Sequence, residues 1–503
     1  MSTQDPLAAL REPATIRARC AAITRAVEEG RSGRFTVDRS ALPALAQRVA
    51  SLTRERFPDL KIPYHSRWRH FEAGGVDRKA ELDARLAGRS AADVARARID
   101  LTVISVLLDA GAGPAWRYTE RPDGPIDPLA LPVHRQKGDD LLAMLTQASG
   151  TAVEAPAPAG ASQAESSTQA SDAPQGDAPV EDSSQDEVAM PAVVSAAPAP
   201  APAVAATSAA TYTRSEGLGV ASFRAFLAGV FSADPADPCR VDALALKRLD
   251  VAALRSVFQA SPSNPLVGLD GRAALLARLG EVLEALAAAR GGPARPGRLF
   301  DELTEGGQNS RISARDLLTR LVTDYAPIWT SGNRVLGLPA GDVWPHLWAG
   351  TDTATGADRA SDRRTSGWVP FHKLSQWLTY SLLEPFEWAG VAVTGLEALT
   401  GLPEYRNGGL LLDGGVIVPR DPRDLARTWT PAHEFVVEWR ALTVTLLDDL
   451  AAQVRQALGV TAEALPLACI LEGGTWAAGR QIARERREGG VPPLQIDSDG
   501  TVF

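Results

Sequence analysis

Residues 90–110 read SAADVARARIDLTVISVLLDA, and this stretch decides the expected fold class. Ser90 is followed three residues later by Asp93, a capping-box pattern that is typical of a helix start. The apolar residues that follow recur with helical spacing up to Ala110. The stretch therefore predicts a helix, and the same combination of start residue and apolar period can be sought elsewhere.

The helical pattern returns in several segments, whereas alternating strand patterns are scarce. Further helices are expected at Ser313–Val322, at Gly271–Arg290 and from Thr430 to about Leu458. In the last of these, Thr430 is the expected N-cap and Pro431 the first helical residue. Residues 410–419 and 491–503 are the best candidates for a short hairpin or extended piece. The expected fold is mostly α, with few short strands.

The composition limits the kind of protein. About 45% of the 503 residues are hydrophobic, which is normal for a globular protein. No basic start and apolar stretch follow Met1, and the longest apolar runs are about half the length of a membrane span. We therefore expect a soluble, cytoplasmic protein with no membrane partner.

The negative charge is concentrated in one segment. The formal net charge is −9, but residues 151–210 hold eight acidic residues and no Lys or Arg. Without that segment the charge is about −1, so the rest of the chain gives no reason to expect binding of polymeric nucleic acid. Residues 151–210 are also rich in Ala, Pro and Ser, which is typical of disorder.

We accordingly expect three parts in the chain. Residues 1–121 are the N-terminal helical part of a single domain, residues 122–211 are a disordered Ala/Pro/Ser/acidic insertion, and residues 212–503 are the main helical part that carries the active site. The insertion is preferred over a linker between two domains because its flanks belong to one motif region.

The first polar segment with possible chemistry is Ile62–Glu72, which holds two His, two Arg and three aromatic residues. His65, Arg67 and Trp68 could bind a phosphate or stack on a base. An aromatic-rich surface loop is an equally good interpretation. The two histidines are five residues apart, which is poor spacing for a metal on one helix face, so no metal is expected.

Glycines follow two other helical patterns. Residues 109–118 read DAGAGPAWRY, where an apolar helix ends in a glycine turn. Gly217 and Gly219 resemble a phosphate-binding loop, but no strand precedes them and no Lys-Ser/Thr pair follows. A tight turn that leads into a helix is the favoured interpretation.

Lys373 is one of five lysines in a chain with 47 arginines, which hints at a need for a compact ammonium group. It follows His372 at the start of an apolar helix. Helical spacing places Lys373, Gln376 and Trp377 on one face. Of these three, Lys373 and Gln376 are candidates for ligand binding.

Two glutamates lie beside glycines in the last quarter of the chain. Glu404 begins the string Glu404-Tyr405-Arg406-Asn407, which is followed by Gly408-Gly409. Glu472 follows an apolar run and precedes Gly473-Gly474 and Trp476. A carboxylate near the core is either paired or has a raised pKa, and the glycines would let a ligand approach the backbone.

Another pair, Glu438 and Arg440, lies within an apolar helix and is expected to be structural.

Seven strings in order resemble the uracil-catabolism family of bacteria and fungi, long catalogued only as a domain of unknown function. They are YHSRWRHFEAGG, LLDAGAG, SEGLGVASF, LTEGGQNSRIS, VPFHKLSQWLTYSLLEPFEWAG, GLPEYRNGGLLLDGG and LEGGTWAAGR. The resemblance covers essentially the whole chain except the acidic segment. In the family the WRYTE region runs almost directly into the SEGLG region, which supports an insertion between them.

The C-terminal half is more distantly similar to the queuosine 5′-phosphate salvage glycosylases. Lys373 and Gln376 match one motif of that family, Glu404-Tyr405-Arg406 a second, and Glu472 with Trp476 a third. This resemblance implies a helical, distantly DNA-glycosylase-like fold of the helix-hairpin-helix superfamily type, and N-glycosidase chemistry.

The chain departs from that second family at two places. Ser381 stands where the family has an Asp, and Asn407-Gly408-Gly409 replaces Val-Pro-Gln. Glu438 and Arg440 match the family's Glu-x-Arg pair. The departures leave open which carboxylate is catalytic and imply a different base pocket.

The resemblances imply a hydrolase of N-glycosyl compounds that cleaves the C1–N bond of ribosylurea 5-phosphate, or a related nucleotide, and releases urea. An oxocarbenium-like transition state wants a carboxylate near C1, for which Glu472 and then Glu404 are the catalytic candidates. The expected substrate-binding residues are Arg406, Lys373 and Arg67 for phosphate, Tyr405, His372 and Asn407 for the leaving nitrogen, Trp476 and Trp68 for the sugar or base, and Gln376 and His65. No cofactor is expected.

Two alternatives stay open. A non-catalytic nucleotide sensor or complex subunit of the same pathway would bind without turnover, which the Ser at position 381 would explain. A sugar-phosphate lyase or isomerase would give an unsaturated or rearranged sugar. In every case the expected partner is a small nucleotide or ribosylurea phosphate, and other pathway enzymes are candidate partners.

Overall fold

Two of the predicted helix starts are present in the computed structural model, which describes residues 5–109, 111–121, 209–329, 333–350 and 363–497. Helix α6 (Ala91–Leu107) begins after Ser90, whose hydroxyl accepts a hydrogen bond from the amide of Asp93 at 3.1 Å. Helix α13 (Ala314–Asp324) is capped by Ser313 in the same way. Helix α11 (Leu269–Arg290) ends at Gly291, which has a positive φ of 76°. These predictions are confirmed.

Helices make up most of the described residues, which confirms the expected fold class. The other helices are α1 (Ala8–Arg11), α2 (Pro13–Glu28), α3 (Leu42–Arg56), α4 (Trp68–Phe71), α5 (Arg78–Arg85), α8 (Arg214–Leu227), α9 (Ala243–Arg248), α10 (Val251–Val257), α12 (Arg298–Thr304), α15 (Lys373–Trp388), α16 (Tyr405–Asp413), α17 (Glu434–Leu458), α18 (Leu467–Ile470) and α19 (Trp476–Arg486).

The strands in the described residues form two-stranded pairs and no larger sheet. Four pairs are antiparallel: β1 (Phe35–Val37) with β10 (Ile417–Pro419), β2 (Arg117–Glu120) with β3 (Ala210–Thr213), β5 (Arg334–Val335) with β6 (Leu338–Pro339), and β7 (Val343–Pro345) with β8 (Trp368–Pro370). Two are parallel: β4 (Arg311–Ser313) with β9 (Ala392–Thr394), and β11 (Thr428–Trp429) with β12 (Gln495–Ile496).

Two local predictions were wrong. Helix α17 begins at Glu434 rather than at Pro431, because the His433 ring accepts the amide hydrogen bond of Phe435 and provides the cap. Residues 410–413 belong to α16, and only residues 417–419 of the expected extended piece form a strand. The second expected extended piece is limited to β12 as far as the structure describes it, since residues 498–503 lie outside the described ranges.

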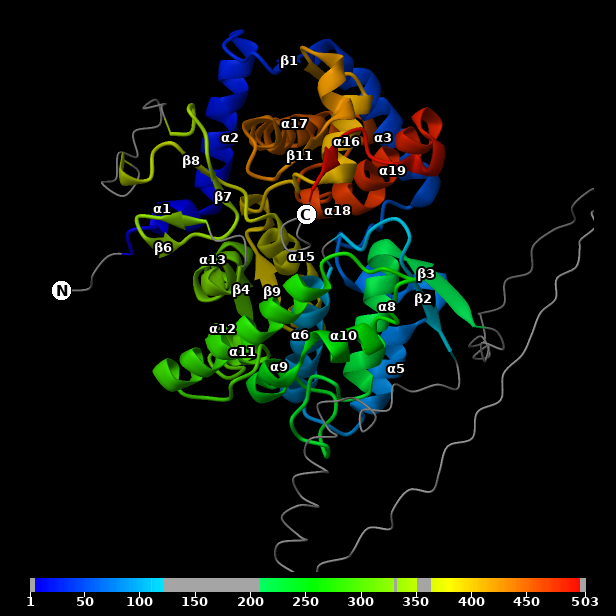
Figure 1. Ribbon diagram of the computed structural model, residues 1–503, viewed down its shortest axis with the longest axis vertical. Helices are drawn as coiled ribbons and strands as arrows, with labels where there is room; N and C mark the ends of the chain where they lie inside the picture. Colours follow the sequence, from blue (N-terminus) through cyan, green and yellow to red (C-terminus); the bar gives the residue numbers. More distant parts are fainter. Residues whose placement is uncertain (1–4, 110, 122–208, 330–332, 351–362, 498–503) are drawn as a thin grey trace, which may run out of the picture. The chain divides into compact units, whose positions relative to one another are not determined.

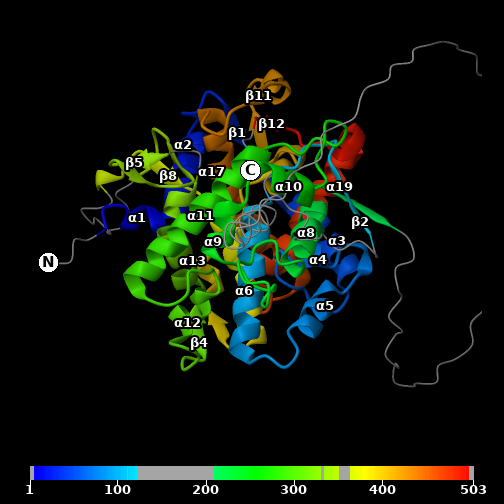
Figure 2. The same cartoon turned by 60° about the horizontal axis from the view of Figure 1, so that its bottom comes forward.

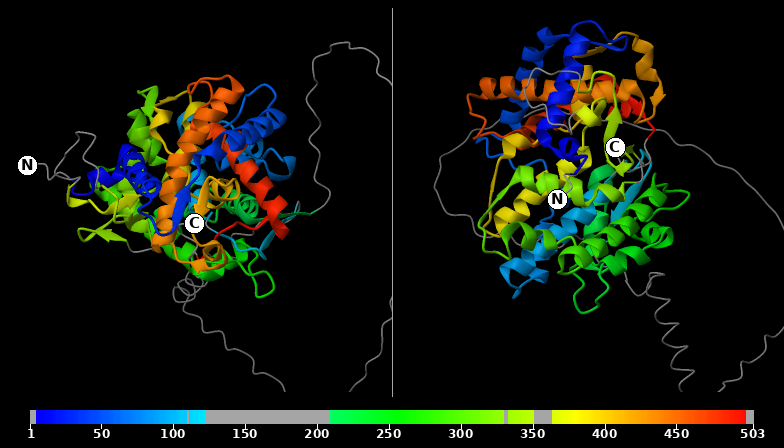
Figure 3. Two further views of the ribbon diagram at one scale, coloured as in Figure 1. Left: turned by 90° about the horizontal axis from the view of Figure 1, so that it is seen from above. Right: turned by 90° about the vertical axis from the view of Figure 1, so that its left-hand side faces the viewer.

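The helices gather in two groups (Figure 1). In the first, α17 contacts α2 and α3, and α16 contacts α19, so the two ends of the sequence pack together. Figure 3 shows this as blue helices beside orange and red ones. In the second group α6 contacts α8, α11 and α12. Figure 2 brings this second group forward, with α6 near its centre. Helix α15 contacts α6 and α13 and lies between the groups, and the larger of two apolar clusters in the described residues includes side chains from both groups.

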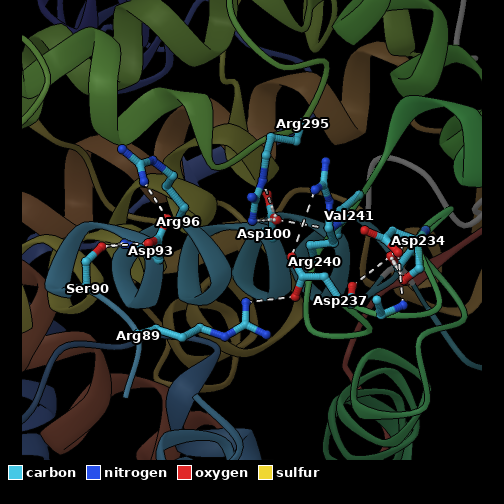
Figure 4. Close-up of polar contacts among 12 residues, drawn as sticks. Arg89, Ser90, Asp93, Arg96, Asp100, Asp234, Asp237, Arg240, Val241 and Arg295 are labelled. Carbon is cyan, nitrogen blue, oxygen red and sulfur yellow. Dashed lines mark hydrogen bonds and ion pairs between the residues drawn. The ribbon is translucent and has the colours of Figure 1, made fainter. Parts of the chain in front are cut away.

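A buried carboxylate fixes two loops on α6. The side chain of Asp100 is fully buried and lies 2.5 Å from a guanidinium nitrogen of Arg295 (Figure 4). It also accepts hydrogen bonds from the amides of Val241 at 3.0 Å and Gly297 at 2.6 Å. Burial raises the pKa of Asp100, and Arg295 opposes this rise. Because an unpaired buried charge is costly, this network positions the loops around residues 241 and 297.

The predicted insertion lies largely outside the described residues, which stop at residue 121 and resume at residue 209. Its flanks are adjacent, because Glu120 pairs with Ala210 in the β2–β3 ladder. The proposed three-part division stays a prediction.

No helix in the described ranges is both long and apolar enough to cross a membrane.

Candidate functional site

Glu472 lies in a π-helical turn, Leu471–Thr475, that joins α18 to α19. Such turns are rare and occur often at functional sites. The adjacent glycines serve packing rather than ligand access, which corrects the expectation for them. A Cβ on Gly474 would lie 2.5 Å from Val49 of α3, and one on Gly473 would lie 2.8 Å from Ile62.

The Glu472 carboxylate is ionised and held in place. His65 Nδ1 lies 2.8 Å from one carboxylate oxygen, and Arg56 lies 3.6 Å from the other. Burial by itself would raise the pKa of Glu472, but the hydrogen bond to His65 and the charges of His65 and Arg56 lower it below its ordinary value. A carboxylate of this kind suits stabilisation of positive charge or activation of water, not donation of a proton.

The start of α15 is fixed by an ion pair. Asp342 receives two hydrogen bonds of 2.7 Å from Arg440 and accepts one from the amide of Lys373 at 3.0 Å. His372 precedes the helix with a positive φ of 48°, and its ring nitrogen Nε2 is 2.8 Å from the carbonyl oxygen of Leu10. These contacts position Lys373 without using its ammonium group.

The Lys373 ammonium has no hydrogen bond or ion pair with any residue in the described part of the chain. Burial lowers the pKa of Lys373, and the negative charges of Glu404 and Asp109 partly offset this effect. A partly buried ammonium group that is near two carboxylates but bonded to neither can donate hydrogen bonds to a ligand with acceptor atoms.

Glu404 is the N-cap of α16. Its two carboxylate oxygens accept hydrogen bonds from the amides of Arg406 and Asn407, each at 2.7 Å. Burial and the charge of Glu404 raise the pKa of Tyr405 to about 12, so the phenol keeps its proton at neutral pH. The Glu404 charge therefore stabilises the helix start and acts on Lys373 at the same time.

Three buried polar atoms gather around Arg67 and have no hydrogen-bond partner in the described ranges: Arg67 Nη2, His70 Nδ1 and Trp377 Nε1. These side chains are 0%, 8% and 5% exposed. The guanidinium carbon of Arg67 lies 5.6 Å from the Trp377 ring centre, and the His70 ring lies 5.7 Å from it, edge to face. Buried polar atoms without partners are rare, so this trio marks a site for a ligand or water.

Asp109 was missed by the sequence analysis. It follows the end of α6 and lies 3.1 Å from Arg67 Nη1, and its charge also acts on Lys373. Trp377 and His70 were named in the sequence only as neighbours of other residues. The sequence gives no hint of a role for them, because it does not show that each has a buried side-chain nitrogen without a hydrogen-bond partner.

His70 connects the two sides of the site. Burial lowers its pKa well below the ordinary value, and the charges of Arg67 and His65 lower it further, while Glu472 opposes them. The Glu472–His65 pair and the Arg67–Trp377 group therefore lie within electrostatic reach of one imidazole. Together with Lys373, Glu404 and Asp109 these residues define what we call the interior site.

An open cavity of about 470 Å³ adjoins the interior site. It is lined by Arg56, Trp476, Ala477, Arg480, Gln481, Arg484 and Glu485. The Arg480 guanidinium lies 4.0 Å from the Trp476 ring centre. Arg480 acts on His70, so the cavity and the interior site are electrostatically connected.

Arg406 lies close by on α16. Burial lowers its pKa to about 10, and the charges of Arg480, Arg214 and Arg484 contribute to the decrease.

Four of the predicted substrate-binding residues either pack in the core or have side-chain polar atoms that already form hydrogen bonds within the protein. Trp68 packs in the core against Phe71 and Trp388. The His372 ring contacts Leu10, the Gln376 amide is bonded to Thr400, and the Asn407 amide is bonded to Leu402 and Thr475.

Ser381 stands where the distantly similar glycosylases have an Asp. Its hydroxyl accepts a hydrogen bond from the amide of Arg67 and donates one to the Trp377 carbonyl oxygen. Glu438 and Arg440 do not pair with each other. Glu438 accepts a hydrogen bond from Ser32 at 2.5 Å, and Arg440 pairs with Asp342.

Among the described residues, no group of three or more His, Cys, Asp or Glu side chains is arranged to hold a metal ion.

Comparison with known proteins identifies relatives over nearly the whole chain. Residues 9–138 and 200–503 match the family described as "Protein of unknown function (DUF1688)". Protein urg3 of Schizosaccharomyces pombe is 33% identical over 477 residues, which cover 93% of this chain and 92% of the relative. Uracil catabolism protein 4 of Lachancea kluyveri is 31% identical over 532 residues, with all of both chains covered. The chain belongs to the DUF1688 family, which includes the uracil catabolism proteins.

Proposed function

We propose that this protein acts in uracil catabolism and hydrolyses the C1–N bond of ribosylurea 5-phosphate, or of a closely related nucleotide. The pathway assignment rests on the family and on the name of the Lachancea kluyveri relative. In the reaction, a water oxygen bonds to C1, the C1–N bond breaks, and the nitrogen takes a proton. With ribosylurea 5-phosphate the products are ribose 5-phosphate and urea.

The observation that best supports action on a small-molecule substrate is the set of hydrogen-bond donors without acceptors in the interior site. Arg67 Nη2 and Trp377 Nε1 are buried donors without acceptors, and the Lys373 ammonium also lacks a partner in the described residues. Sugar hydroxyls and a urea carbonyl are acceptor-rich groups of the right kind. A ligand with such groups would accept hydrogen bonds from these buried donors, which cost free energy when they have no acceptor.

Glu472 is the carboxylate best suited to the reaction. Its lowered pKa keeps it charged, and a negative charge near C1 stabilises the positive charge of an oxocarbenium-like transition state. The bond to His65 Nδ1 fixes its direction. Asp109 and Glu404 contribute further negative charge around Lys373.

The leaving nitrogen needs a proton donor. The amide of Asn407 and the ring of His372 are hydrogen-bonded to backbone carbonyl oxygens, and the third predicted donor is Tyr405. Its pKa, raised to about 12, means that the phenol carries a proton at neutral pH that it could donate to the nitrogen.

The test is to incubate the full-length protein with enzymatically prepared ribosylurea 5-phosphate and to measure urea and ribose 5-phosphate. Both products should appear in equal amounts, and Glu472→Gln should lower their rate of formation by about a hundredfold or more. Glu463→Gln is the matched control, because Glu463 is exposed on the surface. Failure of the wild-type protein to form urea would exclude the glycosidase for this substrate.

A binding protein of the same pathway is the second candidate. It is favoured by one observation: the Glu404 oxygens both cap α16 and a Glu472 oxygen is bonded to His65, so both predicted catalytic carboxylates already have partners. Saturable binding of ribosylurea 5-phosphate by calorimetry, without product, would support this role.

A further inference from the structure

Four arginines from three separate helices lie within electrostatic reach of one another, since Arg214, Arg480 and Arg484 all act on Arg406. Arg214 begins α8, Arg406 lies in the first turn of α16, and Arg480 and Arg484 are one turn apart on α19. Helices α16 and α19 pack closely, because a Cβ on Gly479 would lie 2.3 Å from the Arg406 carbonyl oxygen. We call these four side chains the arginine cluster.

The arginine cluster has fewer negatively charged partners than it has positive charges. Its only ion pair within the described residues is between Arg480 and Glu216, at 3.3 Å. Arg406, which is 9% exposed, donates a hydrogen bond to the carbonyl oxygen of Gly490 at 3.2 Å. Arg214 and Arg484 make no hydrogen bond or ion pair in the part of the chain that the structure describes.

This arrangement costs stability in the free protein. Arginines one helical turn apart repel each other, and the repulsion is stronger where a guanidinium is buried. Burial lowers the pKa of Arg406 and of Arg480, and in both cases the neighbouring Arg214 and Arg484 lower it further. Structural ion pairs are built with matched charges, so an unmatched cluster points to a ligand that supplies the missing negative charge.

The position of the cluster defines the kind of ligand. Arg480 and Arg484 line the open cavity of about 470 Å³, so an anion can reach them from solvent. Arg480 also acts on His70 of the interior site. A ligand that fills the interior site with its acceptor groups would therefore have its anionic end near the arginines.

We propose that Arg214, Arg406, Arg480 and Arg484 form the binding site for the phosphate monoester of a sugar phosphate whose sugar occupies the interior site. Several guanidinium groups around one dianion give short, charge-assisted hydrogen bonds, which a carboxylate or a neutral sugar could not match. Trp476 lies under Arg480 and holds the guanidinium in place. The proposal rests on the proposed function for the identity of the sugar.

Calorimetry of the full-length protein with ribose 5-phosphate, inorganic phosphate and ribose tests this site. Ribose 5-phosphate should bind at least tenfold more tightly than either of the other two, and its affinity should fall as salt rises. The variant Arg214→Gln/Arg484→Gln should lose at least tenfold in this affinity, while its ribose affinity stays the same. Both side chains are exposed, so the variant should fold.

Arg486→Gln is the matched control, because Arg486 is an exposed arginine of α19 that is not part of the cluster. Equal affinities for inorganic phosphate and ribose 5-phosphate would overturn the assignment to a sugar phosphate. Equal losses in the double variant and the control would overturn the site itself. Because binding is measured without turnover, arginine-dependent binding with no urea release would sustain this site and reject the glycosidase.

Discussion

At the scale of single residues, the bond between His65 and Glu472 controls the charge of the proposed catalytic carboxylate. The pKa of Glu472 is lowered, so the carboxylate should keep its charge as the pH falls through the ordinary glutamate range and lose it only below that range. Removal of the His65 bond takes away the largest interaction that lowers this pKa. In His65→Asn, the acid limb of kcat/KM for ribosylurea 5-phosphate should therefore move to higher pH.

His433→Asn is the control for that profile, because His433 is exposed and Asn can also cap α17. Its acid limb should coincide with that of the wild-type protein. An unchanged limb in His65→Asn would mean that Glu472 does not set it.

Asp342 offers a second prediction, for stability. Burial disfavours its ionisation, but Arg440 and two other donors, the Lys373 amide and the Trp344 indole, lower its pKa from 3.8 to about 2. The stability from this pair is present above the unfolded value of 3.8 and is lost as the pH falls toward 2, an effect of about 2 kcal/mol. Asp342→Asn leaves Arg440 buried without its carboxylate and should lower the free energy of unfolding at pH 7 by about 3–5 kcal/mol.

Urea denaturation of the variant measures this loss. Asp421→Asn is the control, since Asp421 is also paired with an arginine but on the surface, where ion pairs contribute little. A loss in Asp342→Asn no larger than in the control would show that the buried pair is not needed for stability.

The sequence could indicate residues of unusual type or setting, such as Lys373 among many arginines or Glu472 after an apolar run. It could not indicate Asp109 or the partners of Arg440, because those contacts join segments far apart in the chain. It also could not indicate Trp377 and His70, since an unpartnered nitrogen depends on everything packed around it.

At the scale of elements, the sequence predicted α6 and α13 from their serine caps, but it did not predict α16. Its N-cap is Glu404, which is not among the usual cap residues, and its interior holds Gly408 and Gly409, which disfavour a helix. The helix forms because its glycines allow close packing. A Cβ on Gly408 would lie 2.2 Å from the Trp439 ring of α17.

Gly408→Ala should therefore lower the free energy of unfolding by about 1–3 kcal/mol, in spite of the better helix propensity of Ala, because the new methyl group meets a buried ring. Gly409→Ala is the matched control in the same helix. Its Cβ would lie 3.1 Å from a ring carbon of Pro493, which can move slightly, so the change should be small. Equal effects in the two variants would contradict the packing argument.

At the scale of the whole molecule, the helical period predicts the fold class but not which helices meet. The packing of α2 and α3 against α17 joins the two ends of the sequence, and no local pattern specifies it. The seven sequence strings that resemble the family lie in order on both sides of the acidic segment, and this order led us to expect one domain over the whole chain. The β2–β3 ladder agrees with that order, since it brings residue 120 beside residue 210.

This ladder leads to a prediction about the segment between its strands. Replacement of residues 123–208 by a short Gly-Ser linker keeps both strands, and an antiparallel pair needs only a few residues to connect its ends. The shortened protein should be recovered in solution with a thermal midpoint close to that of the full chain, and it should bind ribose 5-phosphate with the same affinity.

A second deletion, of residues 117–213, is the control, because it also removes β2 and β3 and with them Tyr118 and Tyr212, which are buried in the core. It should lower the thermal midpoint or prevent folding. If the first deletion behaved like the second, residues 123–208 would have to contribute to the folded domain, and the insertion hypothesis would be wrong.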